Sequence, residues 1–432
     1  MAGMLRFRRK TLPKRVPLEQ AGLFYASISD KPMEGMFRIS ATLKDDVDAG
    51  MLQDALDTVT RRIPYMQYVY DGEFILSSLV DTGKPLKAVE DYGHPMIPIN
   101  WKAGNPLCQL SWKGRTVSID AFHALTDGHG ALVMLMSVLG EYIKRKYGSQ
   151  IEYSSLVLDP SQEPDPEELE DAYKRYARRP SVVDRHRDAF EIKGGKGEKD
   201  DSLRLVHIKA DLSAVKAKAK EAGCSITAFL STLLIDAIQE VKESALKTRL
   251  SKKPIRLTIP VDLRRFYETK TLRNFLSYAD VGIKTKLGHF TIPEIANQVQ
   301  SQMREKVTEK WLNALFSGDL KVLNNNVAKI TPMFIKRGIA TLGMHFLGEG
   351  RFSSTLSNLG NIVLPIAMSE QIADMNFMLG RPHGDHGVST CVSYGNALHI
   401  DFTRTIRNRE TEDLFMKRLD AMGIPFTIVE DY

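Results

Sequence analysis

One short segment of the chain has the residue types and spacing of an acid–base catalytic site. The stretch 117–131, VSIDAFHALTDGHGA, contains the pattern His-x-x-x-Asp-Gly at His123, Asp127 and Gly128. A neutral imidazole that is held in one tautomer beside an acidic proton can act as a general base. The aspartate could orient the histidine directly, or it could fix the turn by pairing with an arginine elsewhere; spacing does not distinguish these. A buried histidine that is hydrogen-bonded at a strand end is the competing, purely structural interpretation.

The residues around this pattern predict how the histidine is presented. Side chains at every second position share one face of a strand, so Val117, Ile119 and Ala121 lie on the same side as His123. After a turn, apolar residues recur at helical spacing over residues 132–143. A carboxylate in the first turn of that helix is stabilised by the positive end of the helix dipole. We therefore expect a strand that ends at the histidine and a helix that begins at the aspartate.

Strand-like and helix-like segments alternate on both sides of the pattern. Strand patterns occur at 36–43, 107–112, 115–122, 203–209, 255–260, 278–284, 355–359, 388–394 and 397–403. Helix patterns occur at 47–62, 212–222, 225–245 and 410–422. The dipeptide Asp71-Gly72 predicts the turn of one further hairpin, between 66–70 and 73–76. These patterns predict an α/β (α+β) fold.

A polar segment separates two α/β halves. Residues 149–202 contain SQEPDPEELED, RRPSVVDRHRD and GGKGEKDD, which are rich in charge and in residues that break regular structure. We interpret residues 151–202 as a crossover linker with one helix at 167–177. It joins a subdomain of residues 1–150, which contains the histidine pattern, to a subdomain of residues 203–432. A chain of 432 residues is long enough for two or three such units.

Composition and charge exclude several classes of protein. The chain is 43% hydrophobic and 26% charged, which excludes wholesale disorder and collagen-like repeats. Its 3 cysteines show no CxxC spacing, so neither a disulfide framework nor a zinc site is indicated, and we read His383 and His386 as turn residues rather than metal ligands. A net charge of +6 falls short of the basic stripe of a nucleic-acid binder. No uncharged apolar stretch of about 18–20 residues predicts a membrane span, and the basic N-terminal run is not followed by the apolar core of a signal peptide. We therefore expect a cytoplasmic protein.

Several segments resemble the chloramphenicol acetyltransferase-like acyltransferases. His123-Ala-Leu-Thr-Asp127-Gly128, after a strand and before a helix, resembles the HxxxDG motif of that superfamily. PVDLR at 260–264, followed by TLRNF at 271–275, resembles its "PVnlR…NF" segment, and SNLG at 357–360 resembles a C-terminal motif. The segment LKDDVDAGMLQDALDTVTRRIPYM resembles the opening strand-to-helix unit of these enzymes. The motifs occur in the family's order over nearly the whole chain, and the bacterial alcohol acetyltransferase branch is the most similar.

This resemblance implies two subdomains with mixed sheets flanked by helices and an active-site channel between them. His123 is expected to be the general base, and Asp127 is expected to pair with Arg264 across the two halves. Gly128 is expected to support the motif. The resemblance also places Asn274, Ser357 and Asn358 near the oxyanion or the channel. The structural alternative for these three is a residue that satisfies backbone groups at a strand end or turn.

The resemblance implies a CoA-dependent acyltransferase, an O-acetyltransferase that moves an acyl group from acyl-CoA to an alcohol or amine without an acyl-enzyme. Acyl-CoA is then a co-substrate, with no permanently bound cofactor and no metal, and we expect a monomer. One alternative is a condensation-type enzyme that uses phosphopantetheine thioesters of an acyl carrier protein. Condensation domains have a second histidine where this chain has Phe122, which weakens that interpretation. Another alternative is a catalytically silent binding module of the same fold, against which the intact motif argues.

Overall fold

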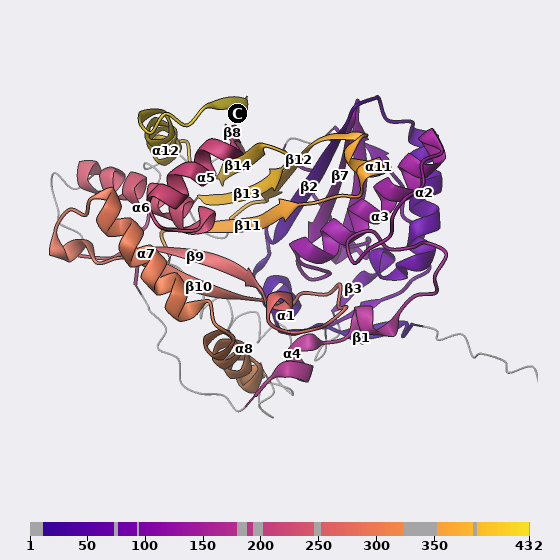
Figure 1. Cartoon of the computed structure of the whole chain (residues 1–432). Helices are drawn as coiled ribbons and strands as arrows, with labels where there is room; N and C mark the ends of the chain where they lie inside the picture. Colours follow the sequence, from indigo (N-terminus) through magenta and orange to yellow (C-terminus); the bar gives the residue numbers. More distant parts are fainter. Residues whose placement is uncertain are drawn as a thin grey trace, which may run out of the picture.

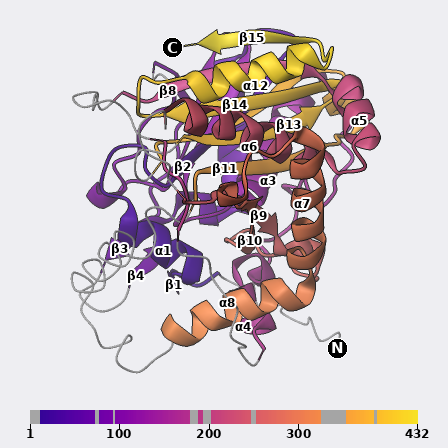
Figure 2. The same ribbon diagram turned by 90° about the vertical axis from the view of Figure 1, so that its left-hand side faces the viewer.

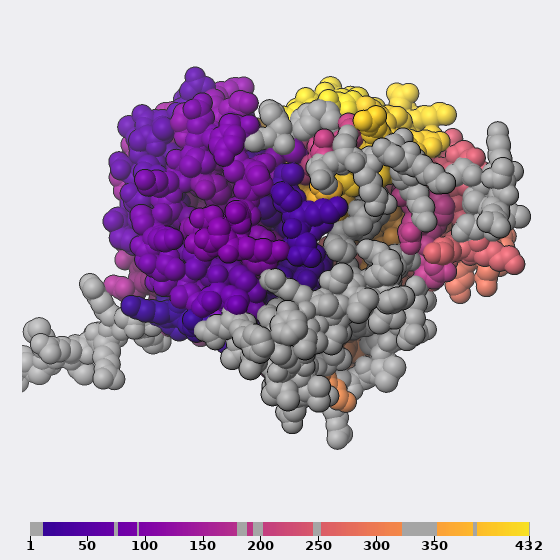
Figure 3. All heavy atoms as spheres, turned by 180° about the vertical axis from the view of Figure 1, so that it is seen from behind, coloured from indigo at the N-terminus to yellow at the C-terminus, as the bar shows by residue number. Residues whose placement is uncertain are grey.

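Two large mixed sheets form the framework of the protein, and helices pack against each of them (Figure 1). The structure is a computed structural model that describes residues 12–72, 77–92, 95–178, 188–192, 202–245, 252–323, 352–382 and 387–431. Viewed from behind, the N-terminal residues and the C-terminal residues form two lobes side by side (Figure 3). The α/β class with two mixed sheets flanked by helices is confirmed.

The first sheet has five strands and is built mainly by the first half of the chain. In spatial order they are β12 (Ile372–Leu379), β2 (Met36–Leu43), β7 (Thr116–Phe122), β6 (Cys108–Lys113) and β5 (Val89–Glu90). Helices α2 (Ala49–Arg62) and α3 (Gly128–Tyr147) pack together beside this sheet. Ile39 of β2 and Ile119 of β7 pair directly, and both are fully buried in the core. The buried core of this sheet therefore fixes the position of the residue that follows β7.

The second sheet has seven strands and belongs to the second half of the chain. In spatial order they are β10 (Leu276–Ile283), β9 (Ile255–Asp262), β11 (Ser354–Ile362), β13 (Val388–Tyr394), β14 (Ala397–Arg404), β8 (Arg204–Asp211) and β15 (Phe426–Asp431). Its helices are α5 (Leu212–Glu221), α6 (Ile226–Ala245), α7 (Ile292–Lys306) and α12 (Glu410–Ala421). They lie in front of the strands in Figure 2 and share a second apolar core with them.

Strand β12 connects the two halves. It lies between β11 and β13 in the sequence, yet it pairs with β2 of the first sheet, with Phe377 opposite Ile39. Its Asp374 binds side chains of the second sheet: Oδ2 accepts from Lys209 Nζ at 2.5 Å, and Oδ1 lies 2.6 Å from His399 Nε2. The first sheet is therefore completed by the second half of the chain.

Smaller elements surround the junction of the halves. A three-stranded sheet has the order β1 (Arg15–Pro17), β4 (Ser77–Val80) and β3 (Val69–Gly72), and α1 (Gln20–Ile28) follows its first strand. The remaining helices include α4 (Ala172–Tyr176), α8 (Glu309–Leu323) and α11 (Ile366–Ser369). A third apolar core joins Tyr173 of the crossover to Phe275 and to Phe316 of α8. The crossover segment thus packs directly against residues that follow β9.

Two local predictions are wrong. Asp71 and Gly72 are not turn residues, because they belong to β3 and pair with Ser78 and Ser77 of β4. The helix predicted at 167–177 is broken into a 3₁₀ helix, Pro166–Leu169, and the short α4. The carboxylates of Asp165 and Asp171 each accept from a backbone N–H and start a separate helix.

Two further sequence expectations concern membranes and metals. Within the described ranges, no single helix is both long and apolar enough to cross a bilayer; α5 and α6 meet the criterion only together, and they are bent by 82°. No group of three or more potential metal ligands occurs in the part of the chain that the structure describes. His383 and His386 lie outside those residues, as does the basic N-terminal run before residue 12.

Candidate active site

The structure places His123 immediately after β7, with its side chain enclosed by aromatic rings. Its backbone N–H donates to Gly35 O at 2.8 Å, and the residue is only 9% exposed. The imidazole stacks on the ring of Tyr25, with centroids 4.2 Å apart and planes within 10°. The ring of Phe37 lies 4.5 Å from it. Strand β7 therefore delivers the imidazole into a site whose walls fix the plane of the ring.

Burial keeps this imidazole neutral. Desolvation lowers the pKa of His123 to about 4, although a hydrogen bond with Asn274, the charge of Asp127 and the Thr126 backbone act in the opposite direction. The neighbouring Tyr25 is also buried, which raises its pKa to about 12. At neutral pH the site therefore contains an uncharged base beside an uncharged phenol.

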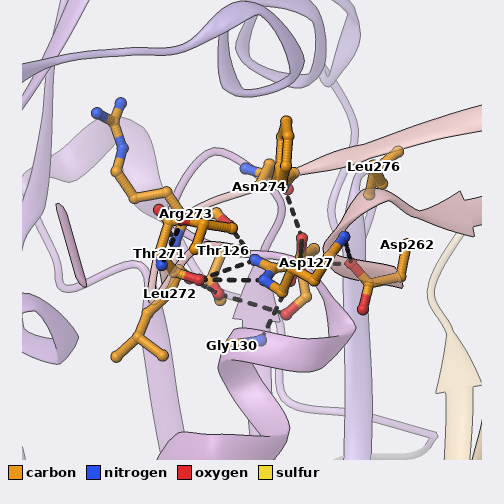
Figure 4. Close-up of polar contacts among 12 residues, drawn as sticks. Thr126, Asp127, Gly130, Asp262, Thr271, Leu272, Arg273, Asn274 and Leu276 are labelled. Carbon is orange, nitrogen blue, oxygen red and sulfur yellow. Dashed lines mark hydrogen bonds and ion pairs between the residues drawn. The ribbon is translucent and has the colours of Figure 1, made fainter. Parts of the chain in front are cut away.

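Asp127 does not hydrogen-bond the histidine; it pairs with Arg264 from the other half of the chain. Figure 4 shows Asp127 between Gly130 and the loop of Thr271 and Asn274. Its Oδ1 caps α3 by accepting from Gly130 N at 3.1 Å. Its Oδ2 accepts from Arg264 Nη1 at 2.9 Å and from Phe275 N at 2.8 Å. Burial alone would raise the pKa of Asp127, but Arg264 and the other groups around the carboxylate hold it below the ordinary value. Of the two roles that the sequence left open, the structure has the pairing with arginine.

Arg264 is buried and uses its whole guanidinium group to hold one loop. Its Nε and Nη2 donate to Thr271 O at 3.1 and 3.0 Å, and Nη2 also donates to Arg273 O at 2.6 Å. Its Nη1 is shared between Asp127 and Asp262, each at 2.9 Å. The motif turn of the first half is thus joined through one arginine to the loop that follows the 3₁₀ helix after β9.

Asn274 lies in that loop, and the structure brings its amide group against His123. Asn274 Oδ1 lies 3.3 Å from His123 Nδ1. Its Nδ2 donates to His123 O at 2.7 Å and to Glu19 Oε1 at 2.6 Å. Both amide N–H groups are therefore already in use, and Asn274 has none left to donate to an oxyanion. These contacts favour a role for Asn274 beside the histidine rather than at the oxyanion.

The two residues of the 357–360 motif lie on opposite faces of β11. Asn358 points toward α6, where Nδ2 donates to Thr227 Oγ1 at 2.9 Å and Oδ1 accepts from Gly360 N at 2.8 Å. Asn358 thus satisfies a turn, which is the structural alternative that the sequence left open. Ser357 faces the other way, because neighbouring strand residues alternate. Its hydroxyl forms no hydrogen bond with any residue that the structure describes, so its role as an oxyanion donor stays a prediction.

Among the motif glycines, Gly130 is more tightly constrained than Gly128. A Cβ on Gly128 would meet only the flexible end of Leu359, at 3.0 Å. A Cβ on Gly130 would lie 2.1 Å from Thr126 Oγ1 and 2.2 Å from Leu272 O. Thr126 Oγ1 also donates to that carbonyl at 2.5 Å. The close approach of the two halves at this point therefore requires glycine at 130.

We expect Gly130→Ala to lower the free energy of unfolding by about 1–3 kcal/mol, because the added methyl group must displace the Leu272 carbonyl. Urea unfolding measures the change. Gly318→Ala is the matched control, since Gly318 is also helical and nothing lies within 4 Å of its Cβ position. The control should be neutral or stabilising. Equal stability of the two variants would contradict the close approach at Leu272.

Two residues of the site, Glu19 and Tyr25, were missed by the sequence analysis, and Arg273 was noted only as part of the 271–275 segment. Glu19 is 1% exposed, caps α1 through Gly22 N, and pairs with Arg273 Nη2 at 3.1 Å. A carboxylate directly before an apolar helical run was the available signal for the cap. No local signal could place Glu19 beside Arg273, which is 254 positions away.

The fold of the whole chain is similar to that of several solved acyltransferases and condensation domains. No family model matches the sequence, and no curated protein matches it. F. sporotrichioides TRI101, complexed with coenzyme A and T-2, aligns with 96% of this chain and 100% of its own, with a TM-score of 0.63 and 12% identity. Polyketide synthase associated protein 5 from Mycobacterium tuberculosis aligns with 93% of this chain and 96% of its own, with a TM-score of 0.61 and 15% identity. The condensation domain of the Monacolin K polyketide synthase MokA aligns with 96% of this chain and 97% of its own, with a TM-score of 0.60 and 11% identity. The chain has the chloramphenicol acetyltransferase-like fold that these proteins share.

Proposed function

We propose that this chain, which has the chloramphenicol acetyltransferase-like fold, is an acyl-CoA-dependent acyltransferase that acylates an alcohol or an amine. The observation that supports this most strongly is the buried, neutral His123, which follows β7 and contacts Asn274 of the second half. The similarity to TRI101, whose structure contains coenzyme A and a small-molecule acceptor, favours acyl-CoA as the donor. Acetyl transfer to a hydroxyl group is the reaction that we propose first.

In the proposed reaction the imidazole of His123 removes the proton from the acceptor hydroxyl as its oxygen attacks the thioester carbonyl. The tetrahedral intermediate then collapses, the carbon–sulfur bond breaks, and the imidazolium returns its proton to the departing thiolate. No acyl-enzyme forms, because the acceptor oxygen attacks directly. We assign Ser357 as a donor to the oxyanion, an interaction that typically contributes a few kcal/mol. Asp127 acts through structure, since its charge is neutralised by Arg264.

A second candidate is condensation-type chemistry on carrier-protein thioesters, which the similarity to the MokA condensation domain favours. Against it, Phe122 occupies the position of the second histidine of such domains. That side chain is fully buried and stacks on Trp101 with centroids 4.7 Å apart. A thiol-release assay with acetyl-CoA and a panel of alcohols and amines tests the first proposal. Turnover only with acylated carrier protein would favour the second, and no turnover with either donor would favour a silent module.

The pH dependence of kcat/KM is expected to report the lowered pKa of His123. A pKa of about 4 leaves the base unprotonated over the whole neutral range, and protonation removes it only when the pH falls toward that value. The rate should therefore be flat from about pH 5.5 to 8 and should fall below about pH 5. An acid limb centred near the ordinary value of 6.5 would contradict the burial of the base.

A further inference from the structure

We propose that Asn274, itself oriented by Glu19, is a positioning residue that keeps the proton of His123 on Nδ1 and its lone pair on Nε2. The observation is a chain of hydrogen bonds from Glu19 Oε1 through Asn274 Nδ2 and Oδ1 to His123 Nδ1. The consequence for catalysis rests on the proposed function. The tautomer itself does not, because it can be measured without any substrate.

The orientation of the Asn274 amide group follows from its acceptors. Its Nδ2 lies 2.7 Å from His123 O, a carbonyl that can only accept, and 2.6 Å from Glu19 Oε1. Exchanging the nitrogen and the oxygen of the amide would direct Oδ1 at two other oxygens and lose both hydrogen bonds. Asn274 Oδ1 must therefore face the imidazole. Because an amide oxygen only accepts, Nδ1 must be the nitrogen that carries the hydrogen.

Glu19 is held as an acceptor by its own contacts. Oε1 also accepts from Gly22 N at 2.9 Å, and Oε2 lies 3.1 Å from Arg273 Nη2. Both oxygens of Glu19 therefore face donors. A proton on Oε1 would point at N–H groups, and a proton on Oε2 would point at the guanidinium group, so these contacts favour the ionised carboxylate. Although burial raises the pKa of Glu19, the positive charge of Arg273 and the amide of Asn274 oppose this. Arg273 is in turn fixed by Pro17 O at 2.5 Å.

Aromatic packing holds the imidazole of His123 in the orientation that faces Asn274. Tyr25 stacks on one face of the imidazole, and Phe37 lies close by at 4.5 Å, so the plane of the ring is set by packing. The hydrogen bond to Asn274 then decides which ring nitrogen bears the hydrogen. Nε2 is left with the lone pair that a general base needs.

An amide is well suited to this task in a buried site. A carboxylate at the same position would fix the same tautomer, but its charge would raise the pKa of the imidazole and would lie against the carboxylate of Glu19. Through Asn274, Glu19 orients the imidazole without placing its negative charge next to the ring. The one carboxylate of the motif, Asp127, is neutralised by Arg264. Because no unpaired negative charge lies against the imidazole, its pKa stays low and it remains unprotonated near neutral pH.

The test is the histidine tautomer, measured by long-range ¹H–¹⁵N correlation spectra of the full chain labelled at histidine and recorded at pH 7. The His123→Ala spectrum identifies the His123 signals by their loss. We expect wild-type His123 to be protonated on Nδ1, and Asn274→Leu, which removes the acceptor at similar volume, to shift the population toward Nε2–H. A wild-type spectrum with the hydrogen on Nε2 would overturn the proposal even if Asn274→Leu does not fold.

Kinetics on the same variants separate positioning from a general structural effect. We expect Asn274→Leu to lower kcat by about 10²-fold with little change in KM, since general-base catalysis contributes about 10²–10⁴-fold. Asn313→Leu is the matched control, because Asn313 is equally buried and donates to Tyr176 O and Tyr267 Oη away from the histidine. It should alter stability but neither kcat nor the His123 tautomer. If Asn313→Leu changes the tautomer as Asn274→Leu does, the proposal fails. A wild-type chain that transfers no acyl group refutes the proposed function alone.

Discussion

His123→Ala is expected to lower kcat for acyl transfer by about 10²–10⁴-fold while the chain keeps its fold. The imidazole of His123 is buried directly after β7, and its lowered pKa of about 4 leaves it unprotonated and available as a base near neutral pH. Tyr25, which stacks on it, cannot take over, because burial raises its pKa to about 12 and its phenol keeps its proton. The backbone contact that places residue 123, from its N–H to Gly35 O, does not depend on the side chain. Loss of turnover should therefore not require loss of structure.

The measurement is thiol release from acetyl-CoA in the presence of the acceptor found for the wild type, together with thermal unfolding of each variant. His399→Ala is the matched control, since His399 is 2% exposed and hydrogen-bonded but interacts with His207 and Asp374 rather than with the motif. It should reduce stability and leave kcat nearly unchanged. A His123→Ala protein that turns over at the wild-type rate would show that the base lies elsewhere.

The sequence predicted the parts of this site that depend on local periodicity. The period of two residues in a strand placed His123 at the end of β7, and the helical spacing after it placed Asp127 at the start of α3. Both rules act over a few residues, and the hydrophobic core enforces them on each side. The same reasoning predicted β2 with the bounds that the structure has, Met36–Leu43.

The contacts that complete the site join residues far apart in the sequence, and no local rule predicts them. Asn274 is 151 positions from His123 and 255 from Glu19. The family resemblance placed Asn274 near the reacting atoms but could not say which of its amide atoms would be free. That depends on the acceptors that surround the amide, which only the folded chain brings together.

Some elements were missed although their signals were present. Residues 372–379 alternate apolar Met375 and Phe377 with polar Asp374 and Asn376, which is the pattern of a strand. No strand was predicted there, and its pairing with β2 could not be foreseen because the neighbouring strands in the sequence, β11 and β13, belong to the other sheet. Helix α7 begins with the capping pair Thr291 and Glu294, a signal that was likewise not used.

The second large expected effect concerns the ion pair of Asp127 and Arg264, which connects the two halves of the chain. Arg264→Met should lower the free energy of unfolding by about 3–5 kcal/mol, because it leaves the buried Asp127 carboxylate without its counter-ion. The pair is 2.9 Å long, and both side chains are at most 8% exposed. The variant also loses the hydrogen bonds to Thr271 O and Arg273 O, so the loop that positions Asn274 is released. We therefore expect kcat of the remaining folded protein to fall as well.

Urea unfolding and kcat together distinguish this role from an ordinary buried ion pair. Arg404→Met is the matched control, since Arg404 and Glu412 are similarly buried, 3.2 Å apart, and both belong to the second half of the chain. It should lower stability but not kcat. The double variant Asp127→Asn/Arg264→Met should lose less free energy of unfolding than the sum of the losses of the two single variants. With residue 127 uncharged, removal of Arg264 no longer leaves a buried charge unpaired. Additive costs, or a loss of stability from Arg264→Met no larger than that from removing the exposed Arg175, would show that Asp127 and Arg264 do not clamp the two halves together.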